Sequence, residues 1–280
     1  MAKINGDTQI VAFLGATYKT SKMYGMYNAA FEALGLNYIY VPFAVNDLEK
    51  AVEGIRHLGI RAAGVTIPYK IAILPYLDEL DSDAKRIGAV NAILNTNGKL
   101  LGANTDGKGA VKALQEVTAL AGKKVIVLGA GGAARAIAFA IADEGGSLVI
   151  VNRTQDAAVA LAKAVDCKYQ TIDKLEQELK DAHIVINATS VGMVPTDNES
   201  LIRKELLSSR LVVMDIISHP KETRLLKEAK GQGCKIVYGD RMLFWQGVLK
   251  FQLYTKVEPP IEVMEKAISD KTKTPTSTFE

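Results

Sequence analysis

The feature that most constrains this chain is a run of apolar residues, 125–128, that passes directly into a glycine cluster at 129–133. An alanine-rich stretch suited to a helix follows without a break. The pattern predicts a strand, a tight turn and a helix. Gly129 permits a backbone conformation that a side chain would forbid, Gly131 allows a pyrophosphate to approach the backbone, and Ala134 allows close packing of helix on strand.

A glycine-rich turn of this kind has two interpretations. It is either a tight connection that binds nothing, or a site where the amides and the positive dipole end of the helix hold a phosphate. The motif is informative only between a strand and a helix. Because both flank it here, the sequence favours dinucleotide binding.

Strand and helix patterns alternate along the rest of the chain, which predicts an α/β fold with helix-covered sheets. Before the glycine turn, strands are expected at 9–14, 38–41, 62–67, 88–94 and 100–102, and helices at 23–35, 46–58 (capped by Asn46) and 108–120. From 125 to 238, five parallel strands with helical crossovers predict a doubly wound, Rossmann-type domain.

The 280 residues are enough for two domains. We expect an N-terminal α/β domain at 1–107 and a dinucleotide-binding domain at 108–239. C-terminal helices at 240–268 are expected to pack back on the first domain. The polar segment 269–280 lacks periodicity and is expected to be a disordered tail.

Composition excludes several classes of protein. The 34 basic and 31 acidic residues are interspersed without a basic block, so neither nucleic acid nor a membrane is expected as a partner. The N-terminus lacks the apolar core of a signal peptide, and charges interrupt the most apolar region, 125–151. Cys167 and Cys234 show no metal-ligand spacing, which favours reduced thiols in a cytoplasmic protein without a metal.

The segment Asn152-Arg153-Thr154 follows the second strand of the expected nucleotide domain, beside the adenosine ribose. NAD enzymes commonly place a carboxylate there to hold the ribose 2′-hydroxyl. A guanidinium attracts a 2′-phosphate instead, so NADP is preferred and NAD is the alternative cofactor. Arg153 could also be an ordinary exposed arginine.

Seven motifs make the chain resemble the shikimate dehydrogenase family, including the related quinate/shikimate enzymes. They occur in the family's order over nearly the whole chain and leave only the tail uncovered. They are GVTIPYK (64–70), GAVN (88–91), NTDG (104–107), GAGGA (129–133), NRT (152–154), NATSVGM (187–193) and GDRML (239–243), the last followed by Gln246-Gly247.

The resemblance implies NADP-linked interconversion of 3-dehydroshikimate and shikimate, or of a close cyclic hydroxy acid such as quinate. It implies that Lys70 and Asp106 form the catalytic pair. Desolvation and a nearby carboxylate can together set a lysine pKa for proton exchange with a substrate hydroxyl. From the residues alone, an ordinary ion pair or two exposed charges would be favoured.

The resemblance also assigns binding residues. Ser21, Thr66, Asn91 and Gln246 are implied to bind the substrate, although Asn91 could serve only as a hydrogen-bonding residue of a hairpin or turn. The implied cofactor residues are Gly129, Ala130, Gly131, Gly132, Ala133, Asn152, Arg153, Thr154, Thr189, Met193 and Gly239.

Three positions depart from the family pattern. Met23 replaces the second serine of a Ser-x-Ser pair that binds the substrate carboxylate, Gly64 replaces an asparagine, and Ser218 replaces a tyrosine. Losing a designed hydrogen bond can cost orders of magnitude in substrate discrimination. Either a nearby residue (Thr20, Lys22 or Ser218) compensates, or the substrate is not shikimate.

Two alternatives to the main hypothesis therefore stay open. One is an enzyme of the same type with a different substrate, and the other is a non-catalytic ligand sensor of the same fold. The expected biology is aromatic amino acid biosynthesis through the chorismate pathway, by a cytoplasmic monomer or homodimer.

Overall fold

The structure, a computed structural model, describes residues 4–16 and 23–269. The chain forms two compact units: unit 1 comprises Met1–Thr105 and Gly247–Glu280, and unit 2 comprises Asp106–Gln246. Unit 1 is thus assembled from two separate stretches of chain. The domain boundaries expected at 107/108 and 239/240 stay predictions.

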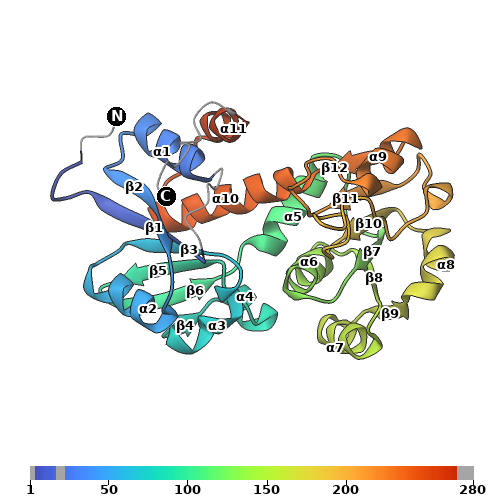
Figure 1. Cartoon of the computed structure of the whole chain (residues 1–280), viewed down its shortest axis with the longest axis horizontal. Coiled ribbons are helices and arrows are strands. Elements are labelled where there is room, and N and C mark those ends of the chain that lie inside the picture. The colour runs from blue at the N-terminus through green and yellow to red at the C-terminus, as the bar shows by residue number, and fades with distance from the viewer. Residues whose placement is uncertain (1–3, 17–22, 270–280) are drawn as a thin grey trace. The chain divides into compact units, whose positions relative to one another are not determined.

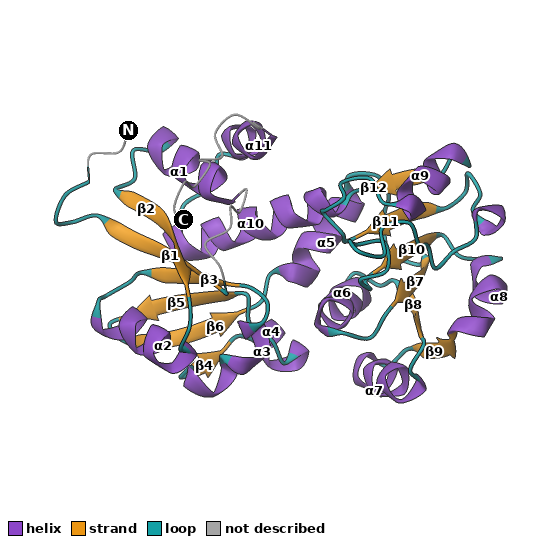
Figure 2. Ribbon diagram, in the orientation of Figure 1, coloured by secondary structure: helices purple, strands orange, loops and turns teal. Residues whose placement is uncertain are grey.

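Unit 1 contains a six-stranded mixed sheet in the order β2-β1-β3-β5-β6-β4 (Figures 1 and 2). Its first three strands run parallel, and β5 runs antiparallel to both β3 and β6. The strands are β1 (Gln9–Gly15), β2 (Tyr38–Ala44), β3 (Ala62–Val65), β4 (Glu79–Leu80), β5 (Ala92–Thr96) and β6 (Lys99–Ala103).

Helices cover both faces of this sheet. Ala12, Leu14 and Val65 point to the face packed against α2 (Leu48–His57), α3 (Tyr69–Ala72) and α4 (Ser82–Ile87). Because side chains alternate along a strand, Phe13 points to the opposite face. There, aromatic rings join the sheet to α1 (Met23–Ala33) and the end of α10 (Gly239–Thr255), and α11 (Ile261–Ser269) packs on α1.

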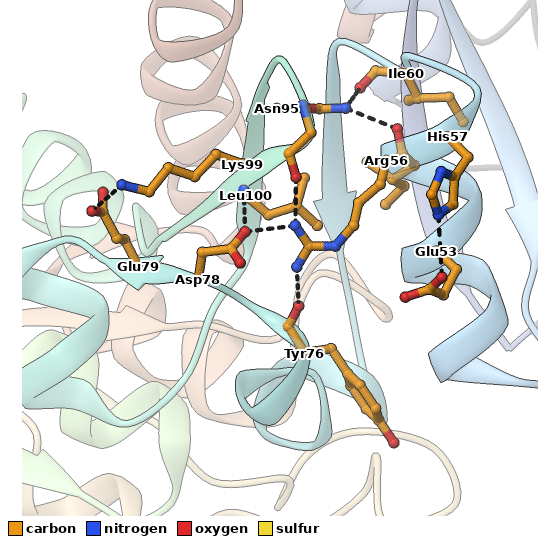
Figure 3. A network of polar contacts seen from close by, with 12 residues as sticks. Glu53, Arg56, His57, Ile60, Tyr76, Asp78, Glu79, Asn95, Lys99 and Leu100 are labelled. Carbon is orange, nitrogen blue, oxygen red and sulfur yellow. Dashed lines mark hydrogen bonds and ion pairs between the residues drawn. The ribbon is translucent and has the colours of Figure 1, made fainter.

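A polar network fastens α2 to the β5–β6 hairpin (Figure 3). The Arg56 guanidinium donates hydrogen bonds to Asp78 Oδ2 (2.6 Å), Gly98 O (2.5 Å) and Tyr76 O (2.8 Å). Asn97 (φ 52°) and Gly98 (φ 86°) form a left-handed turn between β5 and β6. The hydrogen bonds from Arg56 and the Leu100 amide hold the pKa of Asp78 below its ordinary value.

Unit 2 contains a six-stranded, fully parallel sheet in the order β12-β11-β10-β7-β8-β9. The prediction of five strands was wrong, because β9 is a partly exposed edge strand of mostly polar residues without an apolar run. The strands are β7 (Lys124–Leu128), β8 (Ser147–Asn152), β9 (Lys168–Thr171), β10 (Ile184–Asn187), β11 (Val212–Asp215) and β12 (Lys235–Val237).

The helices of unit 2 also lie on both faces, as expected for a doubly wound fold. One core joins the sheet to α5 (Asp106–Gln115), α6 (Gly132–Asp143) and α7 (Gln155–Val165), and the other joins it to α8 (Leu175–Leu179) and α9 (Arg224–Gly231). Strand order reverses between β7 and β10, which is where folds of this type bind ligands. Short 3₁₀ helices occur at Leu74–Tyr76, Ile172–Lys174 and Lys204–Leu206.

Several expected boundaries were wrong. Asp47, not Asn46, caps α2 by accepting a hydrogen bond from Lys50 N at 3.1 Å. The strand expected from residue 88 begins only at Ala92, because Gly88 (φ 73°) closes α4 in the left-handed conformation. A disordered tail was expected at 269–280. Ser269 is instead the last residue of α11, and residues 270–280 lie outside the described residues.

No helix within 4–16 and 23–269 combines the length and apolar character needed to cross a bilayer.

Candidate active site

The carboxyl edge of the unit 2 sheet gathers most of the predicted cofactor residues. The glycine turn follows β7, Asn152 ends β8, Thr189 follows β10, and Gly239 follows β12. Because these strands are parallel, all of these positions lie on the edge where doubly wound folds bind ligands.

The glycine turn is shaped by two different requirements. Gly129 has φ 108°, and a Cβ built there would lie 3.1 Å from both Ala188 O and Thr189 Cγ2. Gly131 is the N-cap of α6, and a Cβ at Gly131 or Gly132 would meet no atom within 4 Å. The first glycine is therefore needed for packing, whereas the next two leave open space at a helix N-terminus, which suits a phosphate.

Thr189 is held by a buried polar network that the sequence analysis missed. Asn187 Oδ1 accepts hydrogen bonds from Thr189 N (3.1 Å) and Thr189 Oγ1 (2.7 Å), and Asn187 Nδ2 donates to Asp215 Oδ1 at 3.2 Å. Asp215 Oδ2 accepts from Thr223 Oγ1 at 2.7 Å. Polar residues ending the apolar strands β10 and β11 were the signal in the sequence that could have revealed this network.

Gly239 and Met193 occupy different environments on this edge. A Cβ at Gly239 would lie 2.5 Å from the carbonyl oxygens of Ile216 and Ile217, so only glycine fits there. Met193 is 46% exposed in the loop after β10, a high value for an apolar side chain. The exposed side chain is accessible for contact with a ligand at this edge.

Arg153 is exposed directly after β8. Asn152 Nδ2 donates to Thr154 O at 2.9 Å, which shapes the turn that carries the arginine. Neither neighbour is a carboxylate. The end of β8 thus offers positive charge where the ribose of a dinucleotide is expected.

In unit 1, Thr66, Lys70 and Asn91 come together where β3 ends. Val65 N donates to Asn91 O at 2.9 Å, and Tyr69 N donates to Thr66 O at 2.9 Å. Val90 N donates to Lys70 O at 2.8 Å, which fixes the backbone of the lysine in the short helix α3. The Lys70 side chain is partly buried.

Asn91 also organises the segment that leads to Asp106. Its Oδ1 accepts from Thr105 N at 3.0 Å, and its Nδ2 donates to Thr105 Oγ1 at 3.1 Å. These hydrogen bonds give Asn91 a structural role, and whether it also binds the substrate stays a prediction. Asp106 follows as the first residue of α5 and is 8% exposed.

The remaining site residues and the three departures lie as follows. Gln246 is buried in α10, and its Nε2 donates to Leu243 O at 2.8 Å. Met23 is buried, and its Sδ lies 2.9 Å from where a Gly247 Cβ would stand. Gly64 is buried in β3, whereas Ser218 is exposed. Ser21, Thr20 and Lys22 lie outside the described residues.

Sequence comparison finds two matching families. Residues 13–93 match the shikimate dehydrogenase substrate binding domain, and residues 111–229 match shikimate / quinate 5-dehydrogenase. The shikimate dehydrogenase (NADP(+)) of Methanocaldococcus jannaschii is 44% identical over 279 residues, covering 96% of this chain and 99% of the relative.

Solved structures agree with these matches. A shikimate dehydrogenase in complex with NADP+ superposes with a TM-score of 0.89 and 43% identity, covering 95% of this chain and 96% of the other. The shikimate 5-dehydrogenase of Listeria monocytogenes, in complex with shikimate and NAD, superposes with a TM-score of 0.88 and 35% identity. The superposition covers 95% of this chain and 98% of the other.

Proposed function

The chain belongs to the shikimate dehydrogenase family, and from this premise we propose that it interconverts 3-dehydroshikimate and shikimate with NADP as the hydride carrier. The observation that carries the proposal is the 44% identity, over 96% of the chain, to a relative named for this activity. The reaction belongs to the chorismate pathway to the aromatic amino acids.

The carboxyl edge of unit 2 fits NADP. The open space at Gly131 and Gly132, above the N-terminus of α6, suits the pyrophosphate, while Gly129, Ala130 and Ala133 form the rest of the turn. Arg153, with Asn152 and Thr154, would hold the 2′-phosphate. Thr189, Met193 and Gly239 would border the nicotinamide half. When bound, NADP supplies the hydride chemistry, and the protein provides orientation.

We assign the proton transfer to Lys70 and Asp106. A lysine beside a carboxylate can take the proton of a substrate hydroxyl and return it in the reverse direction. The hydrogen bond from Val90 N to Lys70 O fixes the backbone that presents the ammonium group. Ser21, Thr66, Asn91 and Gln246 would hydrogen-bond the carboxylate and ring hydroxyls of the substrate.

The relatives at about 44% identity do not favour either alternative. A different substrate was suggested by Met23, Gly64 and Ser218, yet the similar enzymes that contribute most to the assignment are named for shikimate. A non-catalytic sensor is disfavoured because Lys70 and Asp106 are both present. Shikimate is therefore the substrate to test first, with quinate as the comparison.

Location and assembly form a smaller part of the proposal. We propose a cytoplasmic protein, because Cys167 and Cys234 are both free thiols, as expected in a reducing compartment. We expect it to be a monomer or a homodimer.

The test of the function is NADPH formation by the purified protein with shikimate and with quinate, using NADP and NAD in parallel. We expect Lys70→Ala to lower kcat with shikimate by about 10²–10⁴-fold, the usual contribution of a positioned acid or base. The affinity for NADP should not change, because Lys70 is not among the residues assigned to the cofactor.

The matched control is Lys99→Ala, which removes an exposed lysine of the same unit that pairs with Glu79. Its kcat should equal that of the wild type. A wild-type protein that forms no NADPH with shikimate would overturn the proposed activity, and full activity of Lys70→Ala would overturn the role of the lysine.

A further inference from the structure

The helices α5 and α10 lie against each other within unit 2 at a glycine. A Cβ built at Gly109 would lie 2.7 Å from both N and Cβ of Gln246, and 2.9 Å from its Cα. These atoms are backbone or next to it, so no side-chain rotation could relieve the clash. The two helices can approach this closely only with glycine at position 109.

A second glycine, Gly107, lets α5 pack closely against α6 on another side of the helix. A Cβ at Gly107 would lie 2.2 Å from Ala136 O and 3.0 Å from Ala140 Cβ, both in α6. The helix α6 is the one that begins at the glycine turn. The first turn of α5, which starts at Asp106, is therefore in direct backbone contact with the helix that would carry the cofactor phosphates.

A charged cluster joins Glu116, directly after the end of α5, to the first turns of α10. Glu116 Oε1 accepts from Trp245 Nε1 at 2.7 Å, and Glu116 Oε2 accepts from Arg241 Nε at 2.9 Å. Burial raises the pKa of Glu116, but these hydrogen bonds outweigh it and hold the pKa below its ordinary value. Because Glu116 follows Gly109 while Arg241 precedes Gln246, the two helices run antiparallel.

We propose that Gly107 and Gly109 are positioning residues of the reaction. They set the first turn of α5 so that Asp106 stands at a fixed distance from Gln246 on α10 and from the phosphate-binding turn of α6. Asp106 and Gly109 are three residues apart, so they lie on the same side of the helix. This inference rests on the proposed function, in which Asp106 is catalytic and Gln246 binds substrate.

The expected effect follows from the size of the displacement. Carbon atoms in contact are normally about 3.5–4.0 Å apart, so an alanine at position 109 must push the helices apart by about 1 Å. A misplacement of about 1 Å in a reacting group can cost about 100-fold in rate. The glycine turn at 129–133 is untouched by this substitution, so binding of NADP should be preserved.

The test compares Gly109→Ala with Gly146→Ala in the full-length protein. Gly146 is a matched control in the same unit, because a Cβ there would lie 2.6 Å from Ile141 Cγ2, in the core beside the start of β8. We expect Gly109→Ala to lower kcat with shikimate by about 100-fold. The KM for NADP should stay at the wild-type value, and Gly146→Ala should lose thermal stability without this loss of kcat.

The outcomes separate the two hypotheses. An active wild type in which both variants lose kcat equally, or in which Gly109→Ala changes only the KM for NADP, would overturn the positioning role alone. An inactive wild type would overturn the proposed function on which this inference rests. If Gly109→Ala fails to fold, Glu116→Gln tests the same contact between α5 and α10. A fall in kcat at unchanged KM for NADP would support the positioning role of this contact. A kcat equal to that of the wild type would contradict it.

Discussion

The hydroxyl groups of Tyr40 and Tyr254 are buried beside Gly64 in unit 1. A Cβ at Gly64 would lie 3.2 Å from Tyr40 Oη and 3.6 Å from Tyr254 Oη. Neither hydroxyl has a hydrogen-bond partner among the described residues. The family resemblance implies asparagine at position 64, and glycine offers no polar side chain to these two hydroxyls.

We predict that Tyr40→Phe does not destabilise the protein. A buried hydroxyl without a partner costs about 1–3 kcal/mol of desolvation, and phenylalanine removes that cost while keeping the ring. The free energy of unfolding, measured by urea denaturation, should stay the same or rise by up to about 3 kcal/mol.

Tyr27→Phe is the matched control, because the Tyr27 hydroxyl donates to Gly247 O at 2.9 Å and its ring lies 4.6 Å from that of Tyr40. It should lower the free energy of unfolding by about 1 kcal/mol. A loss of stability in Tyr40→Phe as large as that in Tyr27→Phe would show that the Tyr40 hydroxyl is satisfied in solution.

At the scale of elements, Asp215 joins the ends of β10 and β11 to the start of α9. Its carboxylate accepts from Asn187, Thr223 and Ile217 N, and its side chain is fully buried. Burial raises the pKa of Asp215 above its ordinary value of 3.8, although all three hydrogen bonds oppose the shift. The network therefore holds the Thr189 turn with a carboxylate that is costly to ionise.

This raised pKa predicts the sign of a pH dependence. The folded state binds the Asp215 proton more tightly than the unfolded state does, so this group stabilises the fold below pH 3.8 and loses that contribution as the pH rises through the folded pKa. In Asp215→Asn the group cannot ionise. In denaturation experiments, the free energy of unfolding of Asp215→Asn relative to the wild type should therefore increase as the pH rises from 3.8 through the folded pKa of Asp215.

Asp181→Asn provides a control with the opposite sign. The hydrogen bond from Lys124 lowers the pKa of Asp181, so its contribution is present above the ordinary pKa and is lost as the pH falls. The stability of Asp181→Asn relative to the wild type should decrease as the pH rises. If both variants show the same slope, the assigned environment of Asp215 is incorrect.

At the scale of the whole molecule, each unit has its own core, and unit 1 is completed only when the chain returns to it. Phe251, in the second half of α10, is fully buried between Phe31 and Tyr27, with ring centroids 5.3 and 6.2 Å away. These aromatic contacts all lie within unit 1. Residues more than 200 positions apart in the chain thus share one core.

We predict that Phe251→Ala destabilises unit 1 by about 3–5 kcal/mol, the usual cost of truncating a buried phenylalanine. Hydrogen exchange should accelerate at amides of 9–103 and remain unchanged in 124–237, because the lost contacts belong to one unit. Equal acceleration in both segments would show that the two units unfold as one.

Local patterns determined much of what could be predicted. The strand, glycine turn and helix around Gly129 depend on neighbouring residues only, and so does the hairpin turn at Asn97-Gly98. The resemblance to the family rests on such local motifs as well. The wrong predictions had two causes. Two adjacent residues were both suitable as the cap of α2, and Asp47 rather than Asn46 takes that role. The edge strand β9 was missed because it lacks an apolar pattern.

The sequence by itself therefore determined the α/β class, the position of the glycine turn between strand and helix, and the family. Tertiary structure alone decided that Asn91 binds Thr105, that Asp215 binds Asn187, and that Gly109 lies against Gln246. The physical reason is that each of these features is a contact between residues 14 to 137 positions apart. Residue type and periodicity describe one element at a time, whereas such contacts exist only after the elements have packed.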